Sequence, residues 1–197
     1  LLDFVRGQGF RRVILGAGYR GEMVRDYYRE HLPVGMEVLV SLESRPLGTG
    51  GAVKLAEPLF RSDPVLVMNG DSYCAADLTR FLAFHDTRRA LVSLVAARVL
   101  AREEYGTLRI GPEGRLEGFT EKIREGGEAY VNAGLYLLTR ETIRGMPGDR
   151  PFSLERDFFP GLSGRSCYAF VTDAELLDIG TPERYQRARE ILGRKEG

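Results

Sequence analysis

The chain has 197 residues, a length that suits one domain with a substantial core. Its 28 basic and 28 acidic residues balance, so the charge points to neither nucleic acid nor an anionic membrane as a partner. No apolar stretch in these residues is long enough to span a membrane.

The cysteines, histidines and lysines are few enough to be weighed one by one. Cys74 and Cys167 fit neither a disulfide framework nor a zinc motif, so we expect reduced core thiols in a cytoplasmic protein. His31 and His85 are expected on solvated helix surfaces or helix ends. Of the 28 basic residues three are lysines, which leaves 28 − 3 = 25 arginines. A lysine inside a motif therefore carries weight, because an ammonium and a guanidinium bind differently.

The first half of the chain alternates helices with strands. Apolar periodicity, glycines and prolines predict helices over residues 1–8, 22–29, 50–57 and 76–86, and strands over 12–15, 37–40, 65–68 and 91–97. This alternation is typical of a doubly wound α/β fold. We therefore expect a Rossmann-like, mixed and mostly parallel sheet flanked by helices.

The second half is richer in strands. Strands are predicted over residues 107–110, 115–119, 131–138, 168–171 and 176–179, and helices over 153–159 and 182–192. A turn at residues 111–114 makes the first two strands a hairpin. We expect a single domain, 1–197, with a nucleotide-binding half (1–97) and a smaller β-rich sugar-phosphate-binding half that carries the closing helix (98–197).

Two aspartates each follow an apolar strand. Asp71 comes after the run 65–68 and the small residues Asn69 and Gly70, and Asp178 ends the run Leu176-Leu177-Asp178. Ligands of open α/β sheets bind outside the carboxyl ends of the strands, and an aspartate there can hold a divalent metal against phosphate oxygens. Either aspartate alone is more simply a turn residue or a helix cap. Together they predict convergence across 178 − 71 = 107 residues at one metal.

A second pattern competes with this interpretation. Gly16, Gly18 and Gly21 match G-x-G-x-x-G between a strand and a helix, and Glu37 and Glu43 lie near the distance expected for a ribose-binding acid. This pattern occurs in NAD-binding domains, so one interpretation is an NAD-dependent oxidoreductase. The alternative is a glycine-rich turn that lets helix 22–29 pack close to the sheet. We favour the turn, because an NAD domain has no use for the two strands that end in aspartate.

Six short patterns follow one another along the chain. They are Pro46-Leu47-Gly48-Thr49-Gly50-Gly51-Ala52, Asn69-Gly70-Asp71, Tyr105-Gly106-Thr107, Phe119-Thr120-Glu121-Lys122, Val131-Asn132-Ala133-Gly134 and Leu177-Asp178-Ile179-Gly180-Thr181-Pro182. In this order, over residues 13–185, the chain resembles the sugar-1-phosphate nucleotidyltransferases. The segment Ser153-Leu154-Glu155 and the first and third patterns look most like the D-glycero-D-manno-heptose 1-phosphate guanylyltransferase branch.

The resemblance implies an enzyme that joins a nucleoside triphosphate, with GTP favoured, to a heptose or hexose 1-phosphate and releases pyrophosphate. It implies that Asp71 and Asp178 hold Mg²⁺ and that Asp71 and Lys122 act in catalysis. The residues that it implies for nucleotide binding are Leu47, Gly48, Thr49, Gly50 and Asn69. The residues that it implies for sugar-phosphate binding are Gly106, Glu121, Lys122 and Asn132. Neither nucleic acid nor a membrane is an implied partner, and a homo-oligomer is left open.

The family's opening strand, followed by G-G-x-G-T-R-L and a P-K-P segment, is not found in these residues. We therefore expect a chain that starts downstream of the triphosphate cradle, either as a truncated enzyme or as a pseudoenzyme that binds a nucleotide sugar or sugar phosphate without catalysis. In a doubly wound sheet the first strand is central, so strands 12–15 and 65–68 are expected to flank an open slot and not to pair directly.

Overall fold

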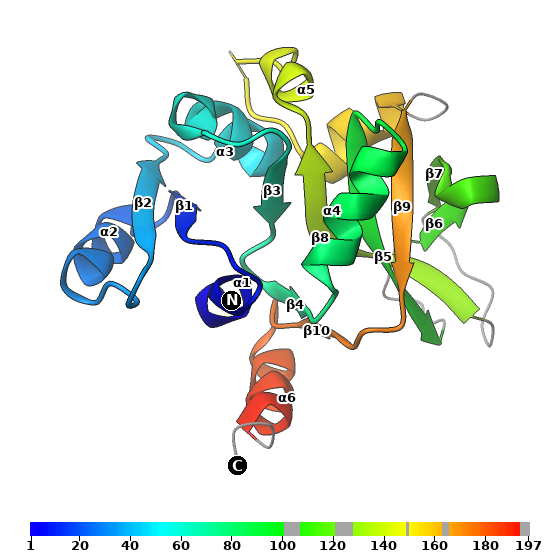
Figure 1. Cartoon of the computed structure of the whole chain (residues 1–197). Helices are drawn as coiled ribbons and strands as arrows, with labels where there is room; N and C mark the ends of the chain where they lie inside the picture. The colour runs from blue at the N-terminus through cyan, green and yellow to red at the C-terminus, as the bar shows by residue number, and fades with distance from the viewer. Residues whose placement is uncertain (101–106, 121–127, 149, 163–165, 194–197) are drawn as a thin grey trace. The chain divides into compact units, whose positions relative to one another are not determined.

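The computed structural model describes residues 1–100, 107–120, 128–148, 150–162 and 166–193 (Figure 1). They belong to two compact units, one built from Leu1–Val65 with Leu138–Arg165 and the other from Leu66–Leu137 with Ser166–Gly197. Each unit therefore draws on two separate stretches of the chain. Among the described residues, no helix is both long and apolar enough to cross a membrane. The expected division at residue 97 concerns which ligand each half binds, and it stays a prediction.

The first unit is built around two parallel strands. β1 (Arg12–Ala17) pairs with β2 (Glu37–Leu42), with Arg12 opposite Glu37 and Ala17 opposite Leu42. The other elements are α1 (Leu2–Gly7), α2 (Gly21–Glu30), α3 (Gly48–Ala56), η1 (Glu57–Leu59), α5 (Arg140–Arg144), the π-helix η3 (Leu154–Phe158) and η4 (Phe159–Leu162). Lys54 of α3 donates to the carbonyl oxygens of Ile143 (3.2 Å) and Arg144 (2.9 Å), which ties α3 to the end of α5.

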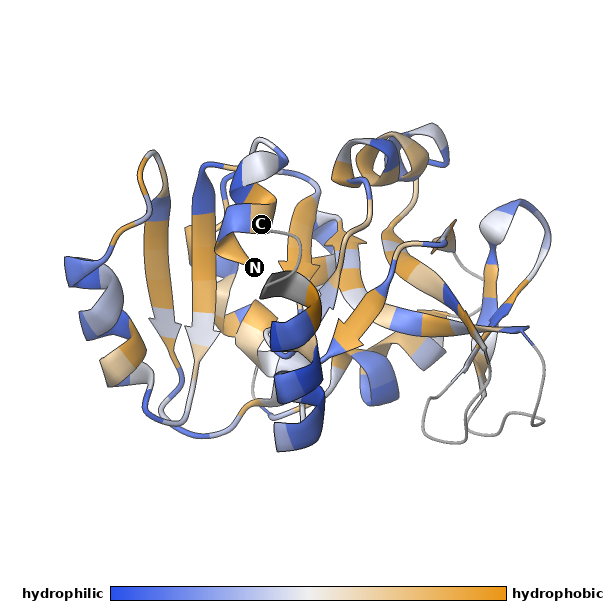
Figure 2. Cartoon of the chain, turned by 90° about the horizontal axis from the view of Figure 1, so that it is seen from below, coloured by the Kyte–Doolittle hydropathy of each residue, from blue (hydrophilic) through white to orange (hydrophobic). Residues whose placement is uncertain are grey.

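α2 packs closely on the strands because its first residue is glycine. A Cβ on Gly21 would lie 2.8 Å from Leu42 Cδ2 and 3.2 Å from Ala17 Cβ. The predicted close approach of this helix to the sheet is thus confirmed. The helix and the strands differ in polarity: at the left of Figure 2, α2 is largely hydrophilic and the two strands beside it are largely hydrophobic.

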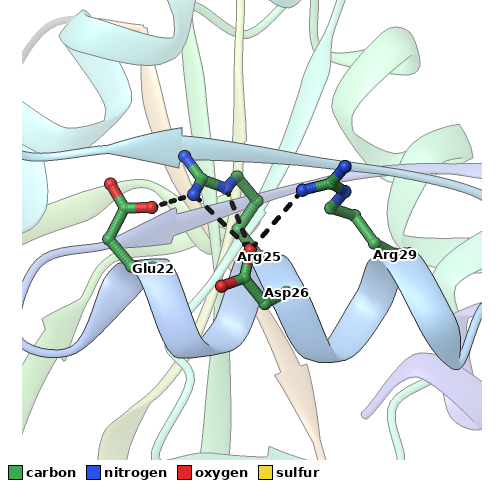
Figure 3. Close-up of polar contacts among 4 residues, drawn as sticks. All are labelled: Glu22, Arg25, Asp26 and Arg29. Atoms are coloured by element: carbon green, nitrogen blue, oxygen red, sulfur yellow. Dashed lines mark hydrogen bonds and ion pairs between the residues drawn. The ribbon is translucent and has the colours of Figure 1, made fainter.

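The outer face of α2 carries a ladder of charges (Figure 3). Arg25 pairs with Glu22 one turn earlier and lies 3.4 Å from Asp26, and Arg29 lies 3.8 Å from Asp26. These side chains are exposed, so each of the two pairs spaced three residues apart contributes only about 0.3–0.5 kcal/mol to the stability of the helix.

The second unit contains a six-stranded mixed sheet. Its strands run in the order β7-β6-β8-β5-β9, and β3 also pairs with β8. β5 and β9 are parallel, whereas β6 is antiparallel to both β7 and β8. The bounds are β3 (Val65–Met68), β5 (Val92–Leu100), β6 (Thr107–Ile110), β7 (Leu116–Thr120), β8 (Glu128–Leu138) and β9 (Cys167–Thr172).

The remaining elements of this unit are β4 (Ser72–Cys74), α4 (Leu78–Thr87), η2 (Pro112–Gly114), β10 (Leu176–Asp178) and α6 (Pro182–Gly193). α4 packs on β5 and β9, where Phe81 and Phe170 lie with ring centroids 5.6 Å apart. β5 is fully buried from Val92 to Ala97, as expected for a largely apolar strand.

Most predicted elements are present, and the predicted α/β class with a mixed sheet is confirmed. β1 forms a two-stranded sheet with β2, and β3 belongs to the six-stranded sheet. Among the described strands, no hydrogen-bond ladder joins β1 to β3. The width of the expected slot stays a prediction. The short strand β4 and the helix α5 had not been predicted.

The prediction for His85 was wrong. This side chain is only 3% exposed, and its Nδ1 lies 2.9 Å from Ser93 Oγ. His85 shares the inner face of α4 with Leu78 and Phe81, so the helical spacing that placed the other two in the core applies to it as well. The two cysteines are free and buried, as predicted, and burial raises the pKa of Cys167 to about 12.

Candidate functional site

Asp71 lies in the turn directly before β4, and Asp178 is the last residue of β10, the strand that pairs with β4 in the second unit. β10 pairs antiparallel with β4, with Asp178 opposite Ser72, and the Ile179 amide donates to the Asp71 carbonyl oxygen at 2.8 Å. The side chain of Asp71 is exposed and that of Asp178 is half-buried. The fold therefore brings the two carboxylates to adjacent backbone positions at the end of β3.

Both oxygens of Asp178 are engaged. Its Oδ1 accepts a hydrogen bond from the Gly180 amide at 2.7 Å, and its Oδ2 lies 2.6 Å from Nη1 of Arg184 in the first turns of α6. The two partners of this ion pair are about one-third exposed, at 28% for Asp178 and 34% for Arg184. A guanidinium thus supplies the positive charge next to Asp178 in this structure.

A glycine inside β8 shapes the same end of β3. Gly134 has φ +72°, and a Cβ there would lie 2.6 Å from Ser72 Oγ and 3.0 Å from Asn69 Cβ. The Asn69 amide donates to the Gly134 carbonyl oxygen at 2.8 Å. Glycine is required because both the left-handed backbone and the close approach exclude a larger residue.

Asn132 lies two residues before Gly134, and its side-chain amide is oriented from both ends. Its Oδ1 accepts from the Gly134 amide at 3.1 Å, and its Nδ2 donates to the hydroxyl of the buried Tyr136 at 2.9 Å. These bonds hold Asn132, Asn69 and the end of β3 in one region of the second unit. An amide keeps a second N–H and a second lone pair for a ligand, so a contact with a sugar hydroxyl remains open to it.

The glycine loop, residues 47–51, lies in the first unit, where Leu47 is the N-cap of α3 and Gly48 to Gly51 form its first turn. The Leu47 amide donates to Glu43 Oε2 at 2.8 Å, and the Leu47 carbonyl oxygen accepts from the Phe152 amide at 2.9 Å. The Phe152 carbonyl oxygen in turn accepts from the Gly50 amide at 3.0 Å. The loop is therefore fixed by main-chain bonds to a segment about a hundred residues away.

Each glycine at the start of the loop meets a neighbour that would exclude a side chain. Gly48 has φ +72°, and a Cβ there would lie 2.6 Å from the Phe152 carbonyl oxygen. A Cβ on Gly50 would overlap the Phe152 ring, 2.7 Å from Cζ. The motif Leu-Gly-Thr-Gly-Gly thus has a packing explanation in addition to its predicted role at a nucleotide base.

Three predicted site residues, Gly106, Glu121 and Lys122, lie outside the described residues. Leu47, Gly48, Thr49 and Gly50 lie together in the first unit, and Asn69, Asp71, Asn132 and Asp178 lie together in the second. Sequence reasoning missed Arg184, Glu43 and Phe152 as partners of these groups. Phe152 reaches the loop from a distant segment, whereas Glu43 lies four residues before Leu47 and Arg184 six residues after Asp178, so these two bonds depend on how the chain turns between the partners.

The two aspartates suit a magnesium ion that is shared with a substrate. Among the described residues, no cluster of three or more His, Cys, Asp or Glu side chains could enclose an ion. Mg²⁺ is commonly held by one or two carboxylates and completes its shell with substrate phosphates and water. Asp71 and Asp178 match that smaller donor set, on the condition that the Arg184 guanidinium gives way at Asp178.

The fold and these motifs define a nucleotide-transferring enzyme class. The family model described as "Nucleotidyl transferase" matches residues 2–194, and the chain belongs to this family. The resemblance to sugar-1-phosphate nucleotidyltransferases is thereby confirmed, and the NAD interpretation of Gly16, Gly18 and Gly21 is not needed. Gly21 is explained by the packing of α2.

Individual relatives agree with this assignment. The chain is 33% identical to a mannose-1-phosphate guanylyltransferase of Mycobacterium tuberculosis, over 98% of this chain and 55% of the relative. It is 32% identical to a D-glycero-alpha-D-manno-heptose 1-phosphate guanylyltransferase of Aneurinibacillus thermoaerophilus, over 96% of this chain and 81% of the relative. The chain thus spans about half of the first relative and about four-fifths of the second.

Among solved structures, the fold is similar to that of HddC from Yersinia pseudotuberculosis in complex with GMP-PN. The TM-score is 0.86 at 33% sequence identity, over 98% of this chain and 83% of that chain. The match extends over both compact units.

Proposed function

We propose that this protein transfers the GMP group of GTP to a heptose or hexose 1-phosphate, forming a nucleotide sugar and pyrophosphate. The observation that carries the proposal is the pairing of β10 with β4, which brings Asp178 beside Asp71 across 107 residues of sequence. Membership of the nucleotidyl transferase family supports the reaction, and the names of two similar relatives support guanine as the base.

In the proposed reaction a phosphate oxygen of the sugar 1-phosphate attacks the α-phosphorus of GTP. A new P–O bond forms, the bond from the α-phosphorus to the bridging oxygen breaks, and pyrophosphate leaves with that bond's electron pair. Such transfers need mainly positioning and neutralisation of charge. The glycine loop would hold the base, and Asn69 would lie at the nucleotide. Gly106, Glu121 and Asn132 would contact the sugar, and Lys122 would neutralise its phosphate.

Asp71 and Asp178 would hold Mg²⁺ in this proposal. When bound, the ion would neutralise the phosphate oxygens around the α-phosphorus and hold them in line. Because two carboxylates fill only part of a magnesium shell, GTP would supply further oxygen ligands. The proposal includes a cytoplasmic location, which two free, buried cysteines favour.

The test is release of pyrophosphate by the protein expressed as its full reading frame. With Mg²⁺ present, we expect release with GTP and either mannose 1-phosphate or D-glycero-D-manno-heptose 1-phosphate, and much less with ATP, CTP or UTP. Absence of release with every pair, together with tight binding of a GDP-sugar, would favour the non-catalytic binding module. A rise in melting temperature on addition of NAD would revive the oxidoreductase interpretation.

A further inference from the structure

A side-chain network joins the glycine loop to η3 in the first unit. Thr49, at the second position of α3, accepts a hydrogen bond through Oγ1 from the Leu154 amide at 2.9 Å. The same hydroxyl donates to Glu155 Oε2 at 2.7 Å. A hydroxyl group has one proton to donate. Because Thr49 Oγ1 accepts from the Leu154 amide, its own proton is directed toward Glu155.

Glu155 Oε2 receives a second hydroxyl. Ser153 Oγ donates to it at 2.7 Å, and the same Oγ accepts from the Arg156 amide at 3.2 Å. Ser153 is the N-cap of η3, and its own amide donates to Asp157 Oδ2 at 2.7 Å. The beginning of η3 is therefore capped by Ser153 and Asp157, and Glu155 is not needed as the cap.

The bond from Thr49 to Glu155 differs from the bonds between the loop and Phe152, because it depends on a side chain. Leu47 and Gly50 are held through main-chain bonds to Phe152, which any side chain at position 155 would leave in place. Thr49 lies between these two fixed points, and its side chain is held by the carboxylate through a short, charge-assisted bond. Glu155 is thus the side chain that, together with the Leu154 amide, orients the middle of the loop.

We infer that Glu155 is a positioning residue for the nucleotide: through Thr49 it holds the glycine loop in the shape that receives the base. The inference rests on the proposed function. A loop that is already ordered before its ligand arrives loses less conformational entropy on binding. Loss of the carboxylate would weaken nucleotide binding and leave the sugar phosphate, which is proposed to bind to groups of the second unit, little affected.

The experiment compares Glu155→Ala and Glu155→Gln with the wild type in the full reading frame. We expect Glu155→Ala to raise the dissociation constant of a non-hydrolysable GTP analogue and the KM for GTP about 10-fold, because a charge-assisted bond is lost. The KM for the sugar 1-phosphate should change less than about twofold. Glutamine keeps an acceptor oxygen, so Glu155→Gln should recover part of the loss.

Glu57→Ala is the matched control. Glu57 follows the far end of α3 and pairs with Lys54 at 2.7 Å, so its loss perturbs the same helix without touching the loop. We expect it to lower stability and leave the KM for GTP unchanged. Thr49→Val should raise the KM for GTP at least as much as Glu155→Ala, because it also removes the acceptor of the Leu154 amide, and the double variant should be no worse than Thr49→Val alone.

Two outcomes would overturn the inference. One is a wild-type KM for GTP in Glu155→Ala despite a lowered melting temperature, which would make Glu155 purely structural. The other is an equal rise of both KM values, which would indicate general loosening. A wild-type protein that neither binds GTP nor releases pyrophosphate would instead refute the proposed function, so the two failures are distinguishable.

Discussion

The glycine loop of the first unit and the aspartate pair of the second are built in opposite ways. The loop is held by hydrogen bonds within the protein: Leu47 bonds to Glu43 and Phe152, Gly50 bonds to Phe152, and Thr49 bonds to Glu155. The aspartate pair rests on two short strands, and Asp71 is exposed while Asp178 faces an arginine. One region is fixed by permanent contacts, whereas the other keeps its charged groups near solvent.

This difference fits the ligands that we propose for each region. A planar base has one shape, and a preformed loop binds it without a cost of ordering. A metal ion that arrives with phosphate oxygens needs carboxylates whose present partner can be displaced. Arg184 has this property, because an ion pair about one-third exposed contributes little net stability.

The largest effect is expected at Asp71. Asp71→Ala removes a ligand that would position the metal in the transition state, so kcat should fall by roughly 10³-fold or more in the pyrophosphate assay. Asp173→Ala is the control, since Asp173 is an exposed residue of the same unit that pairs with Arg98 at 3.2 Å. Near-normal turnover of the Asp71 variant would reject the mechanism.

Gly50→Ala should disrupt the preformed region. The added methyl would overlap the Phe152 ring in a loop that main-chain bonds prevent from moving, so the free energy of unfolding should fall by about 1–3 kcal/mol. Urea unfolding measures this change. Gly7→Ala is the control, because a Cβ there meets nothing within 4 Å and the residue lies in a helix. Equal stability of the two variants would show that the loop rearranges to accommodate the methyl group and would contradict this prediction.

Cys167 is buried in the second unit, in contrast to the exposed Asp71, and its thiol should make the free energy of unfolding depend on pH. Burial raises the pKa of Cys167 from 9.0 to about 12, so the folded state resists ionisation that the unfolded state undergoes. The resulting contribution to stability is complete below pH 9.0 and is lost as the pH rises toward 12, by about 1.4 kcal/mol per pH unit. Chemical denaturation between pH 8 and about 10.5 measures it. Cys167→Ala should show a shallower decline, and parallel curves would contradict the assignment.

The smallest effect is expected at Arg184. Arg184→Gln removes the cation that occupies Asp178 Oδ2, so Mn²⁺ should bind about three- to fivefold more tightly in the presence of a GTP analogue. Electron paramagnetic resonance of free Mn²⁺ reads this affinity without turnover. Arg187→Gln is the control, since it removes the same charge from an exposed position of α6. Weaker binding in Arg184→Gln would mean that the arginine orients Asp178 for the metal.

Local patterns in the sequence sufficed to locate most of the elements. The apolar run 65–68 ahead of Asp71, the glycines of the loop and the proline that starts α6 each act within a few residues, and the structure has β3, α3 and α6 there. Residue order along the chain also sufficed for the family. The two aspartates could be paired in advance because each ends an apolar run.

Tertiary structure decided what holds those groups. β4 is three residues long and exists because β10 pairs with it, so its sequence carries no signal of its own. The partners Thr49 and Glu155 lie 106 residues apart, and Asp178 meets Arg184 through the angle at which α6 leaves β10. His85 became a core residue because α4 turned that face toward β5. Short-range propensity fixes where an element begins and which face is apolar, but hydrogen bonds between distant side chains form only after the packing of those elements sets their distances.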